Sequence, residues 1–495
     1  MKFPRSSGIL LHPTSLPGPF GIGDLGPEAF RFADFLAASG QRLWQMLPLG
    51  PTGYGDSPYQ LFSAFAGNPL LVSPELLLKD GLLEHGDVAG VPDFPQHLVD
   101  FGPVIEWKQD ILRRAFARFR ENRNRGAFDS FCAGEASWLG PFARFMALKE
   151  ANGVSLSWPQ WNRHSTESLE QEVDRVKFWQ FLFFRQWSAL REYCHARGIR
   201  LMGDVPIYVA HDSADVWSAP ELFHLDDRGW PCVVAGVPPD YFSATGQLWG
   251  NPIYRWDRIE QTGYAWWIER FRAAFRMLDM VRLDHFRGFE AFWQVPAGEK
   301  TAIHGQWIKG PGAKLFRALR ASLGELPIVA ENLGVITPEV ESIRHEFDFP
   351  GMAILQFAFG TDPQAPDFRP HNYPRDVVAY TGTHDNDTTV GWWRSTGEGD
   401  STRTSEEVRA EKAHALAYLR SNGEEIQWDF IGALLGSVAS TAIVPMQDVI
   451  GLGSEARMNT PSVPGGNWRW RFRWDQVDQR ISARLALLAK LYDRI

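Results

Sequence analysis

The feature that most constrains this chain is a set of three short apolar segments, each of which ends in a carboxylate. The segments end at Asp284, Glu331 and Asp385, and Arg282 and His384 flank two of these acids. A run of four to eight apolar residues bounded by chain-breaking residues is typical of a strand buried on both faces of a sheet. A charge at the end of such a strand needs a partner or solvent, because removing it from water is costly. The pattern therefore favours a parallel sheet whose carboxyl edge gathers acidic groups.

A single acid in this position has an ordinary alternative explanation, since it often caps a helix or pairs with a surface cation. Three such acids in one chain, each beside Arg, Asn or His, favour a functional rim instead. Parallel barrels carry their catalytic residues on that rim. Asp204 lies inside a fourth apolar segment and is a further candidate carboxylate for the same place.

Eight strand-like segments alternate with helical patterns, and eight such units make a closed (β/α)8 barrel. The helical segments carry start and stop signals, such as Pro27 at the first helical position and Gly40 beyond the end of the first helix. We therefore predict an α/β fold, a TIM barrel with mostly helical and loop insertions on its catalytic face. The expected strands cover residues 8–12, 43–49, 199–208, 280–286, 327–333, 351–357, 377–385 and 441–448.

Two stretches interrupt this alternation. Residues 70–175 hold helical patterns with polar loops between them, and we predict a mostly helical inserted subdomain there. Residues 209–262 form a second predicted insertion, whose aromatic-rich segment 238–252 argues for an active-site loop rather than disorder. The catalytic barrel then comprises residues 1–69 and 176–495.

The overall charge and the cysteine content argue against several classes of protein. The formal net charge is −9, from 50 basic and 59 acidic residues, and no Lys/Arg run stands out, which argues against nucleic acid as a partner. Three widely spaced cysteines argue against a disulfide framework and favour a reducing compartment. No signal-peptide pattern and no apolar span of 18 residues occurs, so no membrane association is expected. We therefore predict a cytoplasmic protein.

No cofactor and no metal is predicted. Residues 21–26 match the G-x-G-x-x-G pattern of dinucleotide sites, but eight loop residues separate them from the preceding strand. The next strand also lacks the acid that such a site needs, so the pattern fails as a cofactor site. The sequence contains neither H-E-x-x-H nor a Cys/His cluster, which argues against a metalloenzyme.

Paired carboxylic acids suit the cleavage of a glycosidic bond. One acid protonates the leaving oxygen, and the other attacks the anomeric carbon or activates a water molecule. Arg282 lies two residues before Asp284 and on the same face of the strand, where its charge would keep Asp284 ionised. Glu331 follows an apolar run without a neighbouring cation, so it is the better proton donor. His384 and Asp385 offer hydrogen bonds to sugar hydroxyls.

Two loops rich in Gly and Pro are expected on the same rim. Residues 50–60 carry Tyr54 and Tyr59, and residues 451–461 follow the last strand. The ordinary interpretation of the first loop is a structural turn. Two tyrosines beside a predicted site favour contact with a ligand, since an aromatic ring offers an apolar face and a polar edge.

These residues resemble those of the α-amylase clan, whose enzymes act on α-glucans with retention of configuration. Four further motifs are similar to those of glycoside hydrolase family 77, the 4-α-glucanotransferases or amylomaltases, and the resemblance extends over essentially the whole chain. It implies transfer of α-1,4-glucan segments from one maltooligosaccharide or glucan to the 4-hydroxyl of another, or to glucose, through a covalent glycosyl-enzyme intermediate. It also implies that no C-terminal β-domain follows the barrel. The motifs are residues 12–18, 51–59, 249–252 and 453–459.

The resemblance implies roles for individual residues. Asp284 is expected to be the nucleophile, Glu331 the acid/base and Asp385 the transition-state stabiliser. Four residues are expected to contact the donor sugar, Trp249 to lie over the acceptor side, and Tyr54 to belong to a secondary glucan site. The donor-site residues are Tyr59, Asp204, Arg282 and His384, and Asn332 and Asn459 complete the expected substrate-binding set.

Two alternatives stay open. A retaining α-1,4-glucan hydrolase uses the same three acids, because either water or a sugar hydroxyl can open the covalent intermediate. A non-catalytic glucan-binding protein would not need all three acids. Their joint presence favours an enzyme, and the analysis of products from a short maltooligosaccharide distinguishes transfer from hydrolysis.

Overall fold

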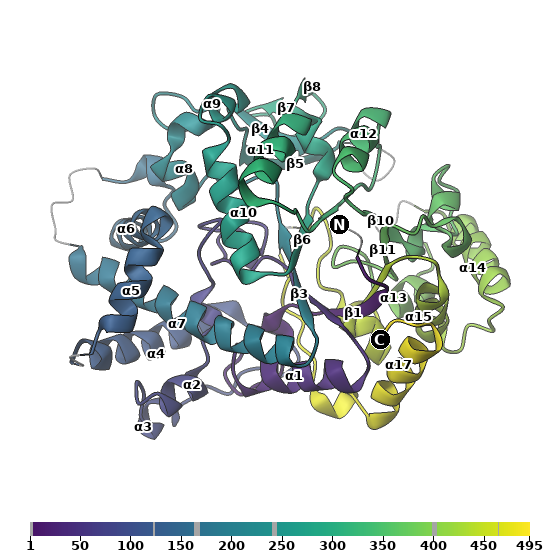
Figure 1. Ribbon diagram of the computed structural model, residues 1–495, viewed down its shortest axis with the longest axis horizontal. Helices are drawn as coiled ribbons and strands as arrows, with labels where there is room; N and C mark the ends of the chain where they lie inside the picture. The colour runs from purple at the N-terminus through teal and green to yellow at the C-terminus, as the bar shows by residue number, and fades with distance from the viewer. Residues whose placement is uncertain (1–2, 122–123, 163–168, 240–244, 398–402, 464) are drawn as a thin grey trace.

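The computed structural model of the chain describes residues 3–121, 124–162, 169–239, 245–397, 403–463 and 465–495. Its centre is an eight-stranded parallel sheet in the order β10-β11-β12-β1-β2-β3-β6-β9, surrounded by helices (Figure 1). Every expected strand is present, so the predicted barrel is confirmed. The strands are β1 (Ser6–Leu10), β2 (Leu43–Gln45), β3 (Arg200–Val205), β6 (Met280–Leu283), β9 (Ile328–Ala330), β10 (Gly351–Ile354), β11 (Val377–Tyr380) and β12 (Thr441–Pro445).

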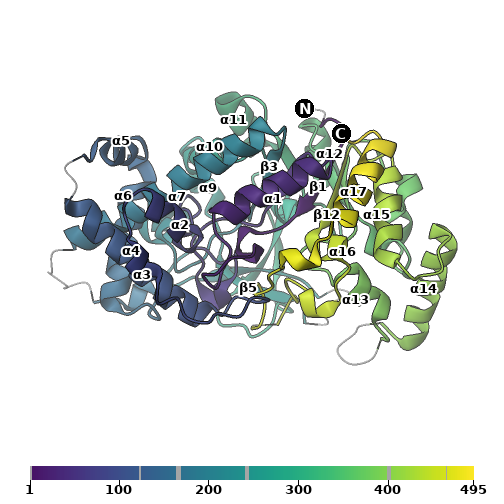
Figure 2. The ribbon, with the colours of Figure 1, turned by 90° about the horizontal axis from the view of Figure 1, so that it is seen from below.

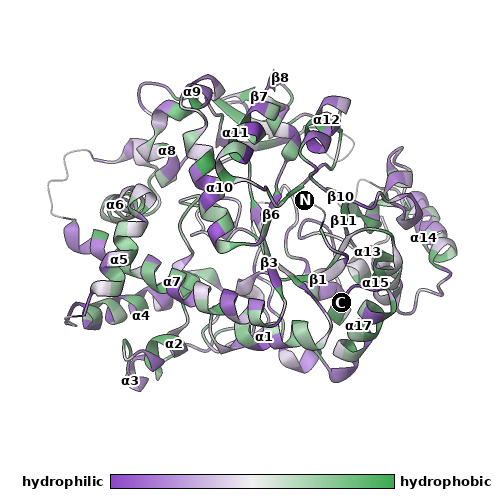
Figure 3. Cartoon of the chain, in the orientation of Figure 1, coloured by the Kyte–Doolittle hydropathy of each residue, from purple (hydrophilic) through white to green (hydrophobic). Residues whose placement is uncertain are grey.

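Amphipathic helices cover the outside of the barrel, and their faces alternate between polar and apolar (Figure 3). In α1 (Pro27–Ala38), Phe32 and Leu36 are fully buried, and the Phe32 ring packs edge-on against Trp44 of β2 at 4.8 Å. Burial of such an apolar stripe, rather than helix propensity, supplies most of a helix's stability in a protein. The other helices of this layer are α10 (Ala265–Met277), α11 (Ala313–Leu323), α12 (Pro338–Glu346), α13 (Thr389–Arg394), α14 (Ser405–Leu419), α15 (Ile426–Gly436), α16 (Met446–Ile450) and α17 (Gln479–Leu491).

Two kinds of element are absent from the part of the chain that the structure describes. No helix there has the length and apolar character needed to cross a membrane. No β-sheet follows β12 there, because the chain continues through α16, short 3-10 turns and α17.

The segment after β10 differs from the expected strand-helix unit. Three 3-10 turns, η7 (Leu355–Phe357), η8 (Ala365–Phe368) and η9 (Pro370–Asn372), follow the strand in place of an α-helix. Four prolines fall between positions 363 and 374, and each removes a backbone donor and blocks helix propagation. The buried Phe359 ring packs instead against residues of α13 and α15, which cover this side of the barrel.

The region between residues 70 and 175 is mostly helical and lies to one side of the barrel (Figure 2). A buried ion pair fastens it to the loop after β1, because Lys108 Nζ lies 3.0 Å from Asp24 Oδ2. The proposed domain boundaries stay predictions. The helices here are α2 (Pro74–Lys79), α3 (His85–Val88), α4 (Phe101–Glu121), α5 (Gly126–Gly134), α6 (Ala136–Asn152) and the start of α7 (Glu170–Ala196).

A small antiparallel sheet stands beside the catalytic rim, in the order β5-β4-β7-β8. Two of its strands, β4 (Val233–Val237) and β5 (Gln247–Pro252), come from the second insertion, which also contains α8 (Ala214–Ser218) and α9 (Trp256–Gln261). The other two, β7 (Ala291–Pro296) and β8 (Gln306–Lys309), follow β6 and extend the sheet beyond the expected insertion. Residues 240–244 of the predicted active-site loop lie outside the described residues.

The barrel closes between β9 and β10 partly through a side chain. The Ala330 N–H donates to the Pro350 carbonyl at 2.8 Å, and the Asn332 Oδ1 accepts from the Met352 N–H at 2.8 Å. The Asn332 Nδ2 donates to Glu341 Oε1 at 2.9 Å. The amide of Asn332 therefore supplies the partner that the neighbouring strand would give in a regular ladder.

Replacing Asn332 with Ala is expected to destabilise the free protein. The change leaves the Met352 N–H without its partner, and an unsatisfied buried donor costs about 1–3 kcal/mol. Scanning calorimetry without glucan should show a lower melting temperature. Asn372→Ala is the control, because this exposed amide contacts a loop carbonyl away from the barrel seam. An unchanged melting temperature together with a raised KM for maltooligosaccharides would instead favour direct contact of Asn332 with sugar.

Candidate active site

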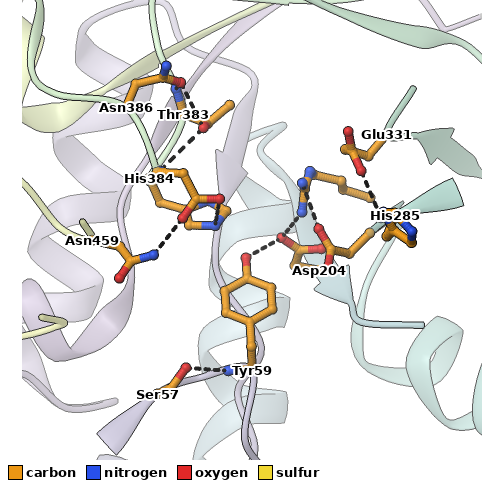
Figure 4. A network of polar contacts seen from close by, with 12 residues as sticks. Ser57, Tyr59, Asp204, His285, Glu331, Thr383, His384, Asn386 and Asn459 are labelled. Carbon is orange, nitrogen blue, oxygen red and sulfur yellow. Dashed lines mark hydrogen bonds and ion pairs between the residues drawn. The ribbon is translucent and has the colours of Figure 1, made fainter. Parts of the chain in front are cut away.

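The carboxyl ends of β3, β6, β9 and β11 bring the predicted acids to one rim of the barrel (Figure 4). Asp204 belongs to β3, Asp284 and Glu331 directly follow β6 and β9, and Asp385 lies in the turn after β11. All these strands run parallel, so their ends share one edge.

Arg282 joins two of the acids. Its Nη1 lies 2.6 Å from Asp204 Oδ2, and its Nη2 lies 2.8 Å from Asp284 Oδ1. Asp204 and Arg282 are direct neighbours on β3 and β6, so strand register creates the first of these pairs. Burial lowers the pKa of the Arg282 guanidinium, but the two carboxylates outweigh it and hold that pKa well above its usual value. The cation is therefore permanent, and it lies directly against the Asp284 carboxyl group.

Glu331 occupies a different environment. Its Oε2 accepts from the His285 N–H at 2.8 Å and its Oε1 from the Leu333 N–H at 2.9 Å. Burial raises the pKa of Glu331 to about 7, and the charge of Asp284 adds to the rise while Arg282 opposes it. The carboxyl can thus hold or release a proton near neutral pH. His285 has φ 49°, a left-handed conformation that is uncommon outside glycine and that sets its N–H toward Glu331.

Asp385 is held from three directions. The Asn459 Nδ2 donates to Asp385 Oδ1 at 2.7 Å, and His384 Nε2 lies 3.3 Å from Asp385 Oδ2. The Arg457 Nη2 donates to the Asp385 backbone carbonyl at 2.7 Å. Burial raises the pKa of Asp385. The charge of His384 and the hydrogen bonds from His384 and Asn459 lower this pKa by more, and they leave it below its usual range. Asp385 is therefore an oriented anion.

Aromatic rings surround the acids on two sides. Tyr59 stacks on His384 with ring centroids 5.2 Å apart, and its hydroxyl donates to Asp204 Oδ2 at 2.7 Å. The Trp468 ring lies 5.8 Å from Tyr59 and 6.0 Å from His384. On the other side, Trp249 of β5 meets His285 edge-on at 4.9 Å.

The remaining predicted residues lie in other settings. Tyr54, in the 3-10 turn η2 (Tyr54–Asp56), is 79% exposed. Asn332 belongs to the seam between β9 and β10 and directs both ends of its amide to protein groups. The Asp204 side chain has no exposed surface, because Tyr59 and Arg282 cover it. The substrate-binding roles of these residues stay predictions.

Two residues of the site were not predicted. Arg457 was within reach of sequence reasoning, since it is a cation in the Gly-rich loop expected on the rim, and its Nε also donates to the Asn459 carbonyl at 2.7 Å. Trp468 carried no such signal, because it lies outside every motif. Within the described ranges, no group of three or more His, Cys, Asp or Glu side chains is arranged to hold a metal ion.

A known protein family matches nearly the whole chain. The family model for the 4-alpha-glucanotransferases, glycoside hydrolase family 77, matches residues 11–477. The chain belongs to this family. The resemblance inferred from the motifs is therefore confirmed, and the enzyme is a 4-alpha-glucanotransferase that transfers α-1,4-glucan segments.

Relatives and solved structures agree with this assignment. The enzyme is 50% identical to the 4-alpha-glucanotransferase of Thermus thermophilus over 517 residues, which cover 100% of both chains. It is 44% identical to the chloroplastic/amyloplastic 4-alpha-glucanotransferase of Solanum tuberosum over 509 residues, or 98% of this chain and 86% of the relative. The amylomaltase from Streptococcus agalactiae in complex with acarbose superposes with a TM-score of 0.93, at 38% identity and 99% coverage of each chain.

The pKa of Glu331 predicts a pH-dependent stability. Its value rises from 4.5 to about 7 on folding, so the folded protein holds this proton more tightly than the unfolded chain. This contribution is fully present below pH 4.5 and is lost as pH rises through 7. Glu331→Gln has no such proton and loses nothing over this range. The melting temperature of the variant minus that of the wild type should therefore increase as pH rises from 4.5 to 8.

Thermal unfolding of both proteins across this pH range measures the difference. Glu106→Gln on the exposed face of α4 is the control for a change of net charge. A difference in melting temperature that is constant from pH 4.5 to pH 8 would contradict the raised pKa.

Proposed function

We propose that the enzyme transfers glucan segments by double displacement, with Asp284 as nucleophile, Glu331 as acid/base and Asp385 as transition-state stabiliser. The observation that carries this proposal is the contrast around Arg282. The guanidinium pairs directly with Asp284, whereas Glu331 has backbone partners and a pKa near 7. A retaining mechanism needs one ionised carboxylate and one carboxylic acid, and environments that separate the two provide them.

In the first step, Asp284 attacks the anomeric carbon while Glu331 gives its proton to the departing glycosidic oxygen. The bond from the anomeric carbon to that oxygen breaks, and a glycosyl ester forms on Asp284. In the second step, the ionised Glu331 takes the proton of an acceptor 4-hydroxyl, whose oxygen attacks the anomeric carbon and releases Asp284. The oriented anion of Asp385 stabilises the positive charge that develops on the sugar in both transition states.

The surrounding residues divide into sugar contacts and positioning contacts. We assign donor-sugar binding to Tyr59, His384 and Arg282, because they line the acids from one side. Asp204 holds Arg282 from behind, and Asn459 holds Asp385. Tyr54 is assigned to a separate glucan site on the basis of the family resemblance and its exposure.

The acceptor is proposed to enter beside Trp249. This ring contacts His285, whose N–H binds the proposed acid Glu331, and the leaving group departs on the side of the acid. Maltooligosaccharides and glucose both offer the 4-hydroxyl that the second step needs. A bound hydroxyl has a far higher effective concentration than a disordered water molecule, which favours transfer over hydrolysis.

Two further expectations stay proposals. The barrel of residues 1–69 and 176–495 is taken as the catalytic unit that carries the insertions at 70–175 and 209–262. A cytoplasmic location is supported by the three cysteines, which are all unpaired.

The role of Glu331 predicts a difference between two donors. Glu331→Ala should lower kcat on maltotriose by about 10²–10⁴, the usual worth of a general acid. The loss should be much smaller with α-glucosyl fluoride, because fluoride leaves without needing the proton as much. Asp284→Asn is the control, since loss of the nucleophile should abolish turnover of both donors. Equal losses on both donors for Glu331→Ala would exclude it as the acid.

The choice between transfer and hydrolysis is tested by counting the reducing ends of the glucans during the reaction. Maltotriose should yield glucose and a ladder of longer glucans while the number of reducing ends stays nearly constant. Trp249→Ala should weaken acceptor binding and raise the hydrolysed fraction. A steady rise in reducing ends, at a rate comparable to glucose release by the wild type, would indicate the hydrolase instead. An unchanged ratio of transfer to hydrolysis in the variant would exclude Trp249 from acceptor binding.

A further inference from the structure

An exposed aromatic group lies on the small antiparallel sheet, next to the rim but outside the site described above. We name it the outer aromatic cluster, and it consists of Arg287, Trp293 and Trp307. Trp307 on β8 is 40% exposed, although large aromatic side chains usually bury most of their surface. The Arg287 guanidinium lies over one face of its ring at 3.8 Å, and Trp293 meets it edge-on at 5.3 Å.

The cluster is rigid. Trp293 and Trp307 are directly opposite each other on β7 and β8, so both rings lie on one face of the sheet. The Trp293 Nε1 donates to the Ala302 carbonyl at 2.8 Å, which fixes the ring against which Trp307 rests. A stacked cation also stabilises an aromatic ring, because the ring face carries negative charge. Trp307 is thus presented to solvent in a fixed orientation.

The cluster is also continuous with the catalytic rim. Arg287 lies three residues after Asp284, in the 3-10 turn η6 (Phe286–Phe289) that leads from β6 to β7. Its Nη1 donates to the carbonyl of Val335, which lies four residues after Glu331. The loops that carry the proposed nucleophile and the proposed acid therefore converge on Arg287, directly behind Trp307. Figure 1 shows β7 and β8 at the edge of the molecule, where a long ligand can continue into solvent.

We propose that the outer aromatic cluster is a distal acceptor subsite that binds glucose units of an α-1,4-glucan beyond the unit that reacts. The inference rests on the proposed function, because Glu331 as the acid defines the acceptor side. An acceptor whose first unit lies beside Trp249 extends away from the acid, past the loop of Val335. A flat indole face matches the C–H face of a pyranose, while the polar ring edge and guanidinium match its hydroxyls. A neutral polysaccharide also suits a cluster whose only charge is already stacked on a ring.

The proposal predicts that acceptor length matters at Trp307. The donor is α-maltotriosyl fluoride, so fluoride release reports cleavage of that donor alone, and the rate without added acceptor, which comes from hydrolysis and self-transfer, is subtracted. Rates are measured with glucose and with maltotetraose as acceptors. Trp307→Ala should lower the ratio of kcat/KM for maltotetraose to kcat/KM for glucose by roughly two- to tenfold, the worth of one aromatic contact.

Two variants make the test specific. Trp307→Phe keeps an aromatic face and should restore most of the ratio. Trp230→Ala removes an indole of similar exposure, 37%, that packs on His211 away from the cluster, and it should leave the ratio unchanged. An unchanged ratio in Trp307→Ala would overturn the proposal. So would a fall of the same size in Trp307→Phe or Trp230→Ala. Failure of the proposed catalytic roles is distinguishable, because it would appear as equal losses on the two donors in Glu331→Ala and not in the acceptor ratio of Trp307→Ala.

Discussion

The catalytic rim depends on one buried cation. Arg282 separates the carboxylates of Asp204 and Asp284, and both would otherwise face each other across neighbouring strands. Buried ion pairs repay the cost of desolvation only when their geometry is good and further hydrogen bonds satisfy them, and the Tyr59 hydroxyl supplies one such bond. Loss of the guanidinium would leave two uncompensated charges in the barrel. The same cation also separates the roles of the acids, because it pairs directly with Asp284, whereas the carboxyl group of Glu331 accepts hydrogen bonds from backbone N–H groups.

Strand register, rather than loop conformation, sets this arrangement. Asp204 and Arg282 belong to the strands themselves, and Asp284 and Glu331 follow their strands without an intervening residue. Groups on strands are held more accurately than groups on long loops. Asp385 is the exception, since it lies in a turn after β11 and takes its orientation from Asn459 and Arg457 on a later segment.

The barrel and the acids were predictable because the core strands are short, largely apolar runs and the acids stand at or near the ends of four of them, which is a signal that sequence alone carries. The antiparallel sheet was not, since β8 reads Gln306-Trp307-Ile308-Lys309 and shows no apolar run, and β6 separates β5 from β7 along the chain. The general strand-helix alternation does not hold after β10, where a proline-rich segment forms 3-10 turns.

The sequence also did not predict which groups the polar side chains of the site contact. Asn332 was expected to be one of the substrate-binding residues. Its partners Met352 and Glu341 become neighbours only when β9 meets β10 and α12 packs outside them. Asp204 was recognised as a rim acid, but its enclosure by Tyr59 depends on a loop 145 positions earlier in the chain.

The anchoring of Asp385 by the segment after the last barrel strand has a consequence for how activity arises during synthesis. A growing chain that has emerged through β11 already contains Asp284, Glu331 and Asp385. It still lacks Arg457 and Asn459, which fix the third acid, and β12, which closes the sheet between β11 and β1. We therefore expect that a ribosome must make nearly the whole polypeptide before the three acids can act together, and that partial products of translation lack activity.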